Sequence, residues 1–214
     1  MDDKTVIEVL KYVGIAIAAG VTWFLKKNPL KKYIKTLRNK RALDRWRKGV
    51  EDMKLIGLEQ FKLYQKYKIP RNAFFIAHNC GDIPTKEKNF YSSLKDSVGI
   101  CADGKDIKLH MEEDFGEKIL VDFKYAEILE EVVRKDYYHF FTDDLDECIL
   151  KSIYKKEDVA ETIMTFYSFD VNTKIFSFSS HSRYNNDEPF SDDQISAIKL
   201  SGNIVRTKLE ENAN

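Results

Sequence analysis

The sequence predicts an α+β protein: an N-terminal transmembrane helix and a basic helical linker, then an antiparallel sheet whose N- and C-terminal helices pack on one face. Three observations predict it. An apolar run adjoins a dense basic run near the N-terminus, two strands flank a polar turn near residue 170, and long helical patterns lie on either side of the strands. We expect a transmembrane helix at 1–27, a basic juxtamembrane helix at 28–41 and a soluble domain at 42–214.

The predicted transmembrane helix contains the stretch TVIEVLKYVGIAIAAGVTWFL, residues 5–25. A helix of that length spans about 31 Å, close to the thickness of the hydrocarbon core of a bilayer. Glu8 and Lys11 lie in its first turns, where they can pair or reach the headgroups. Tyr12 and Trp23 stand where interfacial aromatic residues are enriched, and the Gly and Ala residues between them offer a face for close helix packing.

Three other interpretations of this stretch fit less well. A secretory signal begins with basic residues, whereas this chain begins Met-Asp-Asp. A buried core helix fits poorly beside so many basic residues, and an interfacial helix needs a polar face that residues 12–25 lack. Because basic flanks stay on the cytoplasmic side, we expect an inner-membrane, single-pass protein with its N-terminus outside and its soluble domain in the cytoplasm.

The net charge of zero conceals a strong asymmetry. Residues 26–48 hold eleven Lys or Arg and one acid, Asp44, so the rest of the chain is net acidic. Asn28 and Pro29 suit the start of a helix. We expect this basic run to contact the anionic headgroups of a lipid bilayer through Lys26, Lys27, Lys31, Lys32, Lys35 and Arg38. Nucleic-acid binding, with Tyr33 and Trp46 stacking on bases, is disfavoured because the run adjoins a membrane segment.

The remaining elements follow from hydrophobic periodicity and from turn and capping residues. Pro70 ends the first helix of the soluble domain, and Ser191 with Gln194 forms a capping box before the last helix. Residues 82–124 are hard to interpret. The elements expected in order are a helix at 42–67, strands at 73–77 and 119–123, a helix at 126–135, a strand at 137–141, an acidic loop at 142–147, strands at 162–169 and 174–184 around a turn at 170–173, and a final helix.

The strand at 174–184 alternates between two kinds of side chain. Phe176 and Phe178 point to one side, and Ser177, Ser179 and His181 point to the other. One face of the sheet is therefore packed, and the opposite face is polar, so that it is either wet or lines a pocket.

Two long stretches carry a resemblance to a known family. "EEVVRKDYYHFFTDD" resembles the short helix and strand near the ligand pocket of GAF domains, which are relatives of PAS sensor domains. "ETIMTFYSFDVNTKIFSFSSHSRYNNDEPFSDDQISAIKLSGNIVRTKL" is similar to the GAF hairpin and terminal helix. The resemblance covers about residues 42–211 and implies a domain that binds a small molecule or dimerises. The chromophore cysteine and cyclic-nucleotide motifs of specialised members have no counterpart here.

A second resemblance concerns the architecture. Some tailed-phage holins have one N-terminal membrane helix before an α/β domain of this size, and "GLEQFKLYQKYKIPRNAFFIAHNCG" would stand where that domain begins. Those proteins place the domain outside the cytoplasm, whereas the basic flank here predicts the reverse.

Other chemistry finds weak support in the sequence. His78 and Cys80 could share a metal, but no second pair has ligand spacing, and the acidic loop 142–147 lacks the pattern of a calcium loop. His139, in an aromatic strand, suits a core histidine better than a base. The three cysteines, none in a CxxC pair, suit a reducing compartment. We expect no catalytic residues, no metal and no cofactor, and we take Ser177, Ser179, His181, Tyr167 and His78 as candidate ligand-pocket residues.

The sequence therefore predicts a non-enzymatic, membrane-anchored signalling protein. We expect its GAF-like domain to bind a small ligand or a protein partner, and the chain to form a homodimer. A holin-type protein that opens membrane lesions is the alternative, and a membrane-tethered enzyme is a third interpretation.

Overall fold

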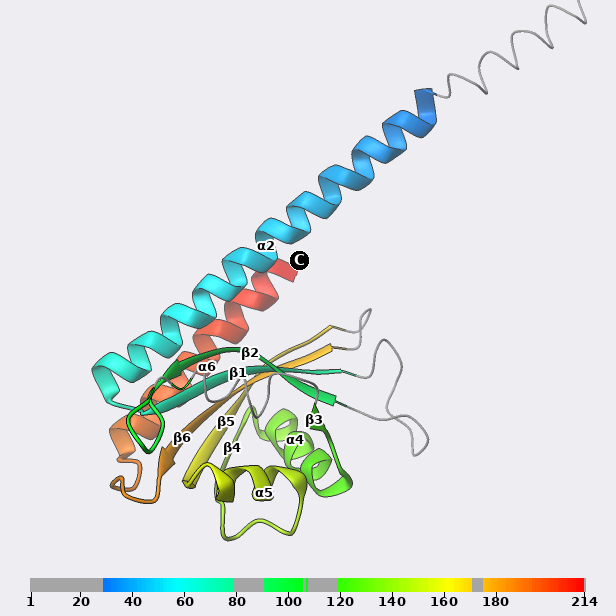
Figure 1. Ribbon diagram of the computed structural model, residues 1–214. Coiled ribbons are helices and arrows are strands. Elements are labelled where there is room, and N and C mark those ends of the chain that lie inside the picture. The colour runs from blue at the N-terminus through cyan, green and yellow to red at the C-terminus, as the bar shows by residue number, and fades with distance from the viewer. Residues whose placement is uncertain (1–28, 79–90, 106, 108–118, 171–174, 214) are drawn as a thin grey trace, which may run out of the picture. The chain divides into compact units, whose positions relative to one another are not determined.

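The computed structural model describes residues 29–78, 91–105, 107, 119–170 and 175–213 (Figure 1). The chain divides into two compact units, Met1–Gly49 and Val50–Asn214. Helix α2, Pro29–Tyr67, covers as one helix the ranges that the sequence assigns to the linker and to the first helix of the domain. No helix among the described residues is both long and apolar enough to cross a membrane, and the predicted span at 1–27 lies outside them.

The core of the second unit is an antiparallel sheet of six strands in the order β3-β2-β1-β6-β5-β4. Its neighbouring strands pair antiparallel throughout. The strands are β1 (Arg71–His78), β2 (Tyr91–Gly99), β3 (Ile119–Leu120), β4 (Tyr137–Phe141), β5 (Val159–Asp170) and β6 (Ile175–Tyr184). The hairpin predicted from the strands at 162–169 and 174–184 is confirmed as β5 and β6. The turn predicted at 170–173 lies mostly outside the described residues.

Helices α2 and α6 (Asp192–Ala213) cover one face of this sheet (Figure 1). Their apolar residues form two buried clusters with the strands, one around Leu63 and Ile198 and one around Ile56 and Val205. The predicted capping box is confirmed, because the Gln194 amide donates to Ser191 Oγ at 3.3 Å and the Ser191 amide to Gln194 Oε1 at 3.0 Å. The predicted α+β fold, with two terminal helices on one face, is therefore confirmed.

Helices α4 (Phe123–Lys135) and α5 (Ile149–Lys156) lie on the opposite face (Figure 1). They cover a large apolar cluster in which aromatic rings stack, such as Phe75 on Phe178 at 5.4 Å between ring centroids. The sequence predicts a strand to residue 123 and a helix from 126, but Asp122 caps α4 by accepting from the Tyr125 amide at 2.8 Å. The helix therefore begins three residues earlier, and β3 is shorter than predicted.

Two elements were not predicted, β2 and α5. Strand β2, YSSLKDSVG, lacks apolar alternation because several of its buried positions are serines. Helix α5 has only eight residues, and its N-cap is Cys148, a residue type that does not announce a helix start. β2 ends at Gly99, whose φ of 144° is accessible to glycine only, since a Cβ there would lie 1.9 Å from the Pro70 carbonyl oxygen.

The polar face of β6 is not wet. Every residue from Phe176 to Tyr184 is buried, because α2 and α6 cover one face of the strand while α4 and α5 cover the other. The alternation of serine and phenylalanine therefore separates two buried layers of different polarity, rather than a core from solvent.

Candidate functional site

A buried group of polar residues lies at one end of the face that α4 and α5 cover. Arg71, the first residue of β1, donates from Nη2 to Glu157 Oε2 at 2.7 Å and from Nη1 to Ser182 Oγ at 3.2 Å. The side chains of this ion pair are 1% and 3% exposed. The guanidinium also lies over the Tyr154 ring, 5.3 Å from its centroid, and the Tyr154 hydroxyl bonds Ser180 Oγ at 2.8 Å. The ion pair is thus enclosed by a ring and by hydroxyl groups.

The electrostatics of this group favour the charged pair. Burial alone would lower the pKa of Arg71, but the charge of Glu157 outweighs it and raises that pKa above its usual value. For the Tyr154 hydroxyl, whose charged form is an anion, burial raises the pKa, so this group stays neutral at physiological pH. One acceptor is left over, since the Glu157 Oε1 atom is buried and has no hydrogen-bond partner.

A cavity of about 200 Å³ opens beside the ion pair. The turn that follows β2 forms one wall, closed by the bonds Cys101 N to Lys105 O at 2.8 Å and Gly104 N to Cys101 O at 2.9 Å. The end of α5 and the end of β6 form the others. The residues that line the cavity are Arg71, Cys101, Ala102, Asp103, Ile107, Lys156, Glu157, Asp158 and Tyr184.

The predicted pocket residues of β5 and β6 lie on the other face of the sheet. Ser177, Ser179, His181 and Tyr167 are 6%, 0%, 0% and 1% exposed, beneath α2 and α6. The Gln60 side chain of α2 donates to Ser179 Oγ at 3.4 Å. The structure therefore brings these four residues to one buried layer, and the 200 Å³ cavity is not lined by any of them.

His181 is held as a neutral imidazole. Its Nδ1 lies 2.9 Å from Asn72 Oδ1, and Asn72 Nδ2 donates to the Ile69 carbonyl at 2.9 Å, so His181 Nδ1 is the donor. His181 Nε2 is buried and has no partner. Because burial penalises the charged form, the pKa of His181 falls to about 3.

The other histidines named from the sequence lie at strand edges and ends. His78, the last residue of β1, has its Nε2 3.4 Å from Ser93 Oγ. Cys80 lies outside the described residues, and among those that are described no group of His, Cys, Asp and Glu could hold a metal ion. His139 Nε2, on edge strand β4, lies 2.6 Å from Glu161 Oε1. His139 is partly exposed and Glu161 is buried. The Arg183 Nε atom donates to the second oxygen of the Glu161 carboxylate, Oε2.

Glu161 joins three parts of the chain. Besides His139 and Arg183, the backbone amide of Phe190 donates to its Oε2 at 3.0 Å. Burial alone would raise the pKa of Glu161, but these donors outweigh it and hold the pKa below its usual value. The cluster fixes the loop before α6 against β4 and β5, which is a structural role.

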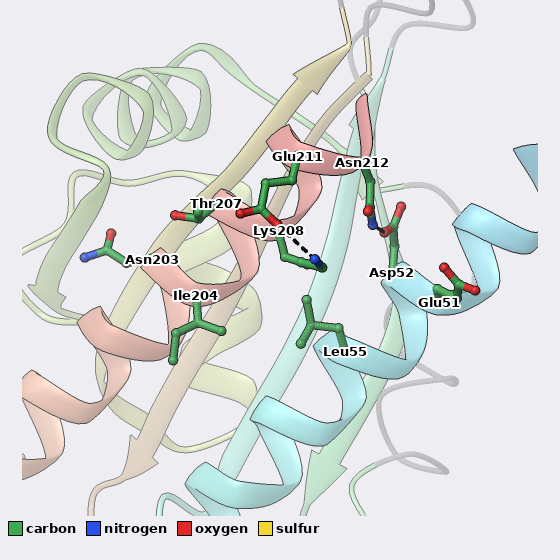
Figure 2. A pocket seen from close by; sticks show the side chains of 9 residues that line it. All are labelled: Glu51, Asp52, Leu55, Asn203, Ile204, Thr207, Lys208, Glu211 and Asn212. Atoms are coloured by element: carbon green, nitrogen blue, oxygen red, sulfur yellow. Dashed lines mark hydrogen bonds and ion pairs between the residues drawn. The ribbon is translucent and has the colours of Figure 1, made fainter. Parts of the chain in front are cut away.

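A second cavity, a groove of about 520 Å³, lies between α2 and α6 (Figure 2). Leu55 of α2 and Ile204 of α6 face each other across it, and Lys208 lies between them, paired with Glu211 at 2.8 Å. Asp52 accepts from the Asn212 side chain at 2.7 Å and ties the end of α6 to α2. The groove is thus an apolar trough with charges of both signs on its rim.

Of the six residues expected at a membrane surface, only two have described side chains. Lys35 and Arg38 are exposed on α2, Lys31 and Lys32 belong to α2 by backbone alone, and the other two lie outside the described residues. Contact with lipid stays a prediction.

Sequence reasoning missed the Arg71–Glu157 pair. The available signal was Arg71 itself, a charged residue directly before the apolar run AFFIA in a strand expected to be buried. A buried charge needs a partner, but the partner stands 86 residues later, at the end of a helix that was not predicted.

Comparisons with known proteins identify the fold. A scan against protein-family models finds no match, and neither does a search of curated proteins. Among solved structures, the GAF domain/HD domain protein from Geobacter sulfurreducens is similar over 75% of this chain and 92% of its own, at 15% identity and a TM-score of 0.50. A far-red cyanobacteriochrome photoreceptor is similar over 84% and 99%, at 8% identity and a TM-score of 0.52.

A third neighbour is a GAF domain from Synechocystis in its photoproduct state, similar over 75% of this chain and 94% of its own, at 7% identity and a TM-score of 0.51. Residues of the second unit therefore adopt the GAF fold, which is the fold that the resemblance in the sequence implies. The structural similarity establishes the fold, but at identities this low it says nothing of the ligand or partner, which must be argued from the residues themselves.

Proposed function

We propose that this chain is a membrane-anchored, non-enzymatic signalling protein. Its GAF-fold domain binds a small ligand or a protein partner, and two copies associate through α2 and α6. The observation that carries the proposal is the position of α2. The helix covers the polar layer of the sheet, and its Gln60 side chain donates a hydrogen bond to Ser179 of β6. The same helix includes most of the basic run at its N-terminal end. A change in the sheet can therefore be passed along this helix.

The engagement of the buried titratable groups supports a non-enzymatic role. Glu161 accepts from three donors, and Arg71 is paired with Glu157, so these charges are used for folding. His181 is buried as a neutral imidazole beneath the helices, away from the described cavities. A general base needs a reachable atom beside a space for substrate, and neither Glu161 nor His181 meets that requirement.

The outer surface of α2 and α6 supports the homodimer. Leu58 and Leu200 are 67% and 57% exposed, one turn along their helices from Leu55 and Ile204 of the groove. The rim carries acids such as Glu51 together with Lys208, so a twofold arrangement can place opposite charges against each other. Such a self-complementary apolar surface is best covered by a second copy of the same surface.

The dimer is tested on the full chain in detergent by light scattering. Leu58→Asp with Ile204→Asp should convert the dimer to a monomer, because two carboxylates would be buried at the interface. Phe123→Asp is the matched control, since Phe123 is 75% exposed but belongs to α4 on the opposite face. A monomeric wild-type chain, or a double variant that still dimerises, contradicts this part of the proposal.

The membrane anchor is tested by fractionating cells. The native chain should stay in the membrane pellet after washing with high salt and with carbonate, and a variant without residues 1–27 should move to the supernatant. Equal partitioning of the two contradicts the anchor. Release of the native chain by salt alone indicates surface binding by the basic run instead of a spanning helix.

The orientation is tested with a thiol reagent that does not cross membranes. Cys101 and Cys148 are buried, so Glu188→Cys in the exposed loop before α6 gives a readable site in a chain whose third cysteine is removed by Cys80→Ser. We expect no labelling in intact cells and full labelling after lysis. Labelling in intact cells would place the domain outside, which is the arrangement of the holin-type alternative. Loss of respiration on expression would support that alternative further.

A further inference from the structure

We propose that the cavity beside Arg71 and Glu157 is a binding site for a small molecule that carries a primary ammonium group. The inference rests on the proposed ligand-binding function for its biological meaning, and on the residues of this chain for its chemistry. It names a class of ligand and the atom that receives it, the Glu157 Oε1 oxygen.

Glu157 has an acceptor atom that no described group uses. Its side chain is 3% exposed, and its Oε2 receives Arg71, but its Oε1 is buried and has no hydrogen-bond partner. A buried carboxylate oxygen without a donor is costly, so buried polar atoms of this kind are normally satisfied. Because Glu157 lines the cavity, a donor bound there can supply the missing bond.

The C-terminal end of α5 favours a cation in the cavity, because the helix dipole places partial negative charge there. Glu157 and Asp158 line the cavity opposite Arg71 and Lys156, and the third carboxylate of the lining, Asp103, is already paired with Lys105 at 2.7 Å. The charges of the lining are therefore nearly balanced, and the helix end favours a positive group.

The existing bonds of Arg71 disfavour an anion. Arg71 is fully buried, and its two terminal nitrogens already donate to Ser182 Oγ and Glu157 Oε2. A carboxylate or phosphate beside the guanidinium would lie against the Glu157 carboxylate, which carries the same charge. An ammonium donor is instead attracted to that carboxylate.

The size of the cavity limits the ligand. A volume of about 200 Å³ holds about six water-sized groups, at about 30 Å³ each. Part of the lining is apolar, formed by Ile107 and the buried Cys101. The Tyr184 hydroxyl already donates to the Ile100 carbonyl at 2.8 Å. An ammonium group on a short carbon chain matches one charged end and one apolar wall.

Binding is measured by nuclear magnetic resonance titration of the full chain in detergent micelles, with ethanolamine as the probe. Ethylene glycol replaces the ammonium by a neutral hydroxyl group, and glycolate replaces it by an anion. We expect saturable shifts of the amides of residues 101–105 and 156–158 with ethanolamine only. Saturation by glycolate, equal saturation by all three, or no saturation by ethanolamine overturns the proposal, and in the last case the cavity holds water alone.

Two variants locate the site. Glu157→Gln replaces the carboxylate by a neutral amide, which removes the negative charge and one acceptor oxygen. It should weaken ethanolamine binding at least about tenfold. Ala102→Leu fills the cavity from its exposed rim without touching the ion pair, so it gives the same readout if Glu157→Gln fails to fold. Glu188→Gln, an exposed glutamate in the loop before α6, is the control and should bind as the native chain does. Unchanged binding in Ala102→Leu overturns the proposal.

The outcome can be separated from that of the proposed function. Dimerisation through α2 and α6 and partitioning with the membrane do not involve the cavity, so both can hold while ethanolamine fails to bind. In that case only the ligand class is wrong. If ethanolamine binds but the chain is a monomer, the site stands and the proposed dimer is wrong. If ethanolamine binds but the chain stays in the supernatant, the site stands and the proposed anchor is wrong.

Discussion

The two faces of the sheet use polar residues in opposite ways. Beneath α2 and α6, polar side chains are spread along the strands and bond one another or a helix, as Ser168 does with Ser177 at 2.7 Å and Gln60 with Ser179 at 3.4 Å. Beneath α4 and α5, the centre is a stack of aromatic rings, and the polar groups gather at one end around Arg71. Buried acceptors without a partner occur on both faces, such as His181 Nε2 on the first. On the second face, such an acceptor belongs to Glu157, which lines a cavity.

The polar groups beneath α2 and α6 stabilise the fold, whereas those beneath α4 and α5 lie beside a cavity that we propose binds a ligand. Spread over the strands, single hydrogen bonds fix α2 and α6 on the sheet and leave little space between them and the strands. At the end of the second face, the Arg71–Glu157 pair is shielded by the turn after β2, the end of α5 and the end of β6. These segments enclose the cavity of about 200 Å³. Polarity on a strand therefore does not by itself mark a binding face.

The largest expected effect comes from the gathered charges. Arg71→Ala leaves Glu157 buried without its partner and should lower the free energy of unfolding by about 3–5 kcal/mol. Arg71→Met with Glu157→Leu removes both charges and should recover most of the loss. Denaturant titration of the two variants decides the matter. A cost under about 1 kcal/mol for Arg71→Ala would mean that this end of the sheet is open to water, which breaks the contrast between the faces.

A somewhat smaller effect is expected from the helix side. Ile198 belongs to α6 and is fully buried, so Ile198→Ala should lower the free energy of unfolding by about 2–4 kcal/mol through lost burial and a new cavity. Leu200→Ala, two residues along the same helix and 57% exposed, is the matched control. Its expected effect on the monomer is within about 0.5 kcal/mol. Equal losses for the two variants would show that the outer surface of α6 is also buried.

The next effect concerns pH and His181. Burial lowers its pKa to about 3 from 6.5, so the unfolded chain binds this proton more tightly than the folded one. The stability that the neutral ring contributes is complete above pH 6.5 and declines as the pH falls. Between pH 6.5 and 5 the free energy of unfolding should drop by about 2 kcal/mol from this residue. Glu161, whose low pKa also adds stability, acts below that window.

His181→Gln provides the comparison for this pH effect. The amide can keep a bond to Asn72 and carries no titratable proton, so its unfolding free energy should be flatter between pH 6.5 and 5 than that of the native chain. Parallel curves for the two proteins would show that water reaches His181 Nε2 and that the layer beneath α2 and α6 is wet.

The sequence was sufficient for most of the fold and for little of the site. Long helical patterns, the hairpin and the capping box at Ser191 each arise from local rules, and they place α2, β5, β6 and α6 correctly. The resemblance of two stretches to GAF domains indicated the fold, but the order of the strands in the sheet was not predicted. Strand β2 was missed because buried serines are not typical of a strand, and α5 was missed because a helix of only eight residues depends on tertiary contacts for its stability.

The candidate site was harder because it depends on contacts between distant residues. Alternation along β6 correctly separated the phenylalanine side from the serine side, but only the placement of α2 and α6 shows that the serine side is buried. The cavity forms where the end of α5, the turn after β2 and the start of β1 meet. None of those three segments carries a local signal for it, and the Arg71–Glu157 pair joins residues 86 positions apart.

The smallest expected effect tests whether a spread polar layer is needed at all. Gln60 donates to Ser179 over a long 3.4 Å, while its Oε1 is buried without a partner. Gln60→Met keeps the length of the side chain and removes the unsatisfied oxygen, but it also leaves Ser179 without its donor. These two consequences oppose each other, so the free energy of unfolding should change by less than about 1 kcal/mol. Gln60→Met combined with Ser179→Ala removes both polar groups and should be at least as stable as the native chain. A loss above about 2 kcal/mol in the double variant would show that this single bond fixes α2 on the sheet, which makes it the point at which the helix and the strands are coupled.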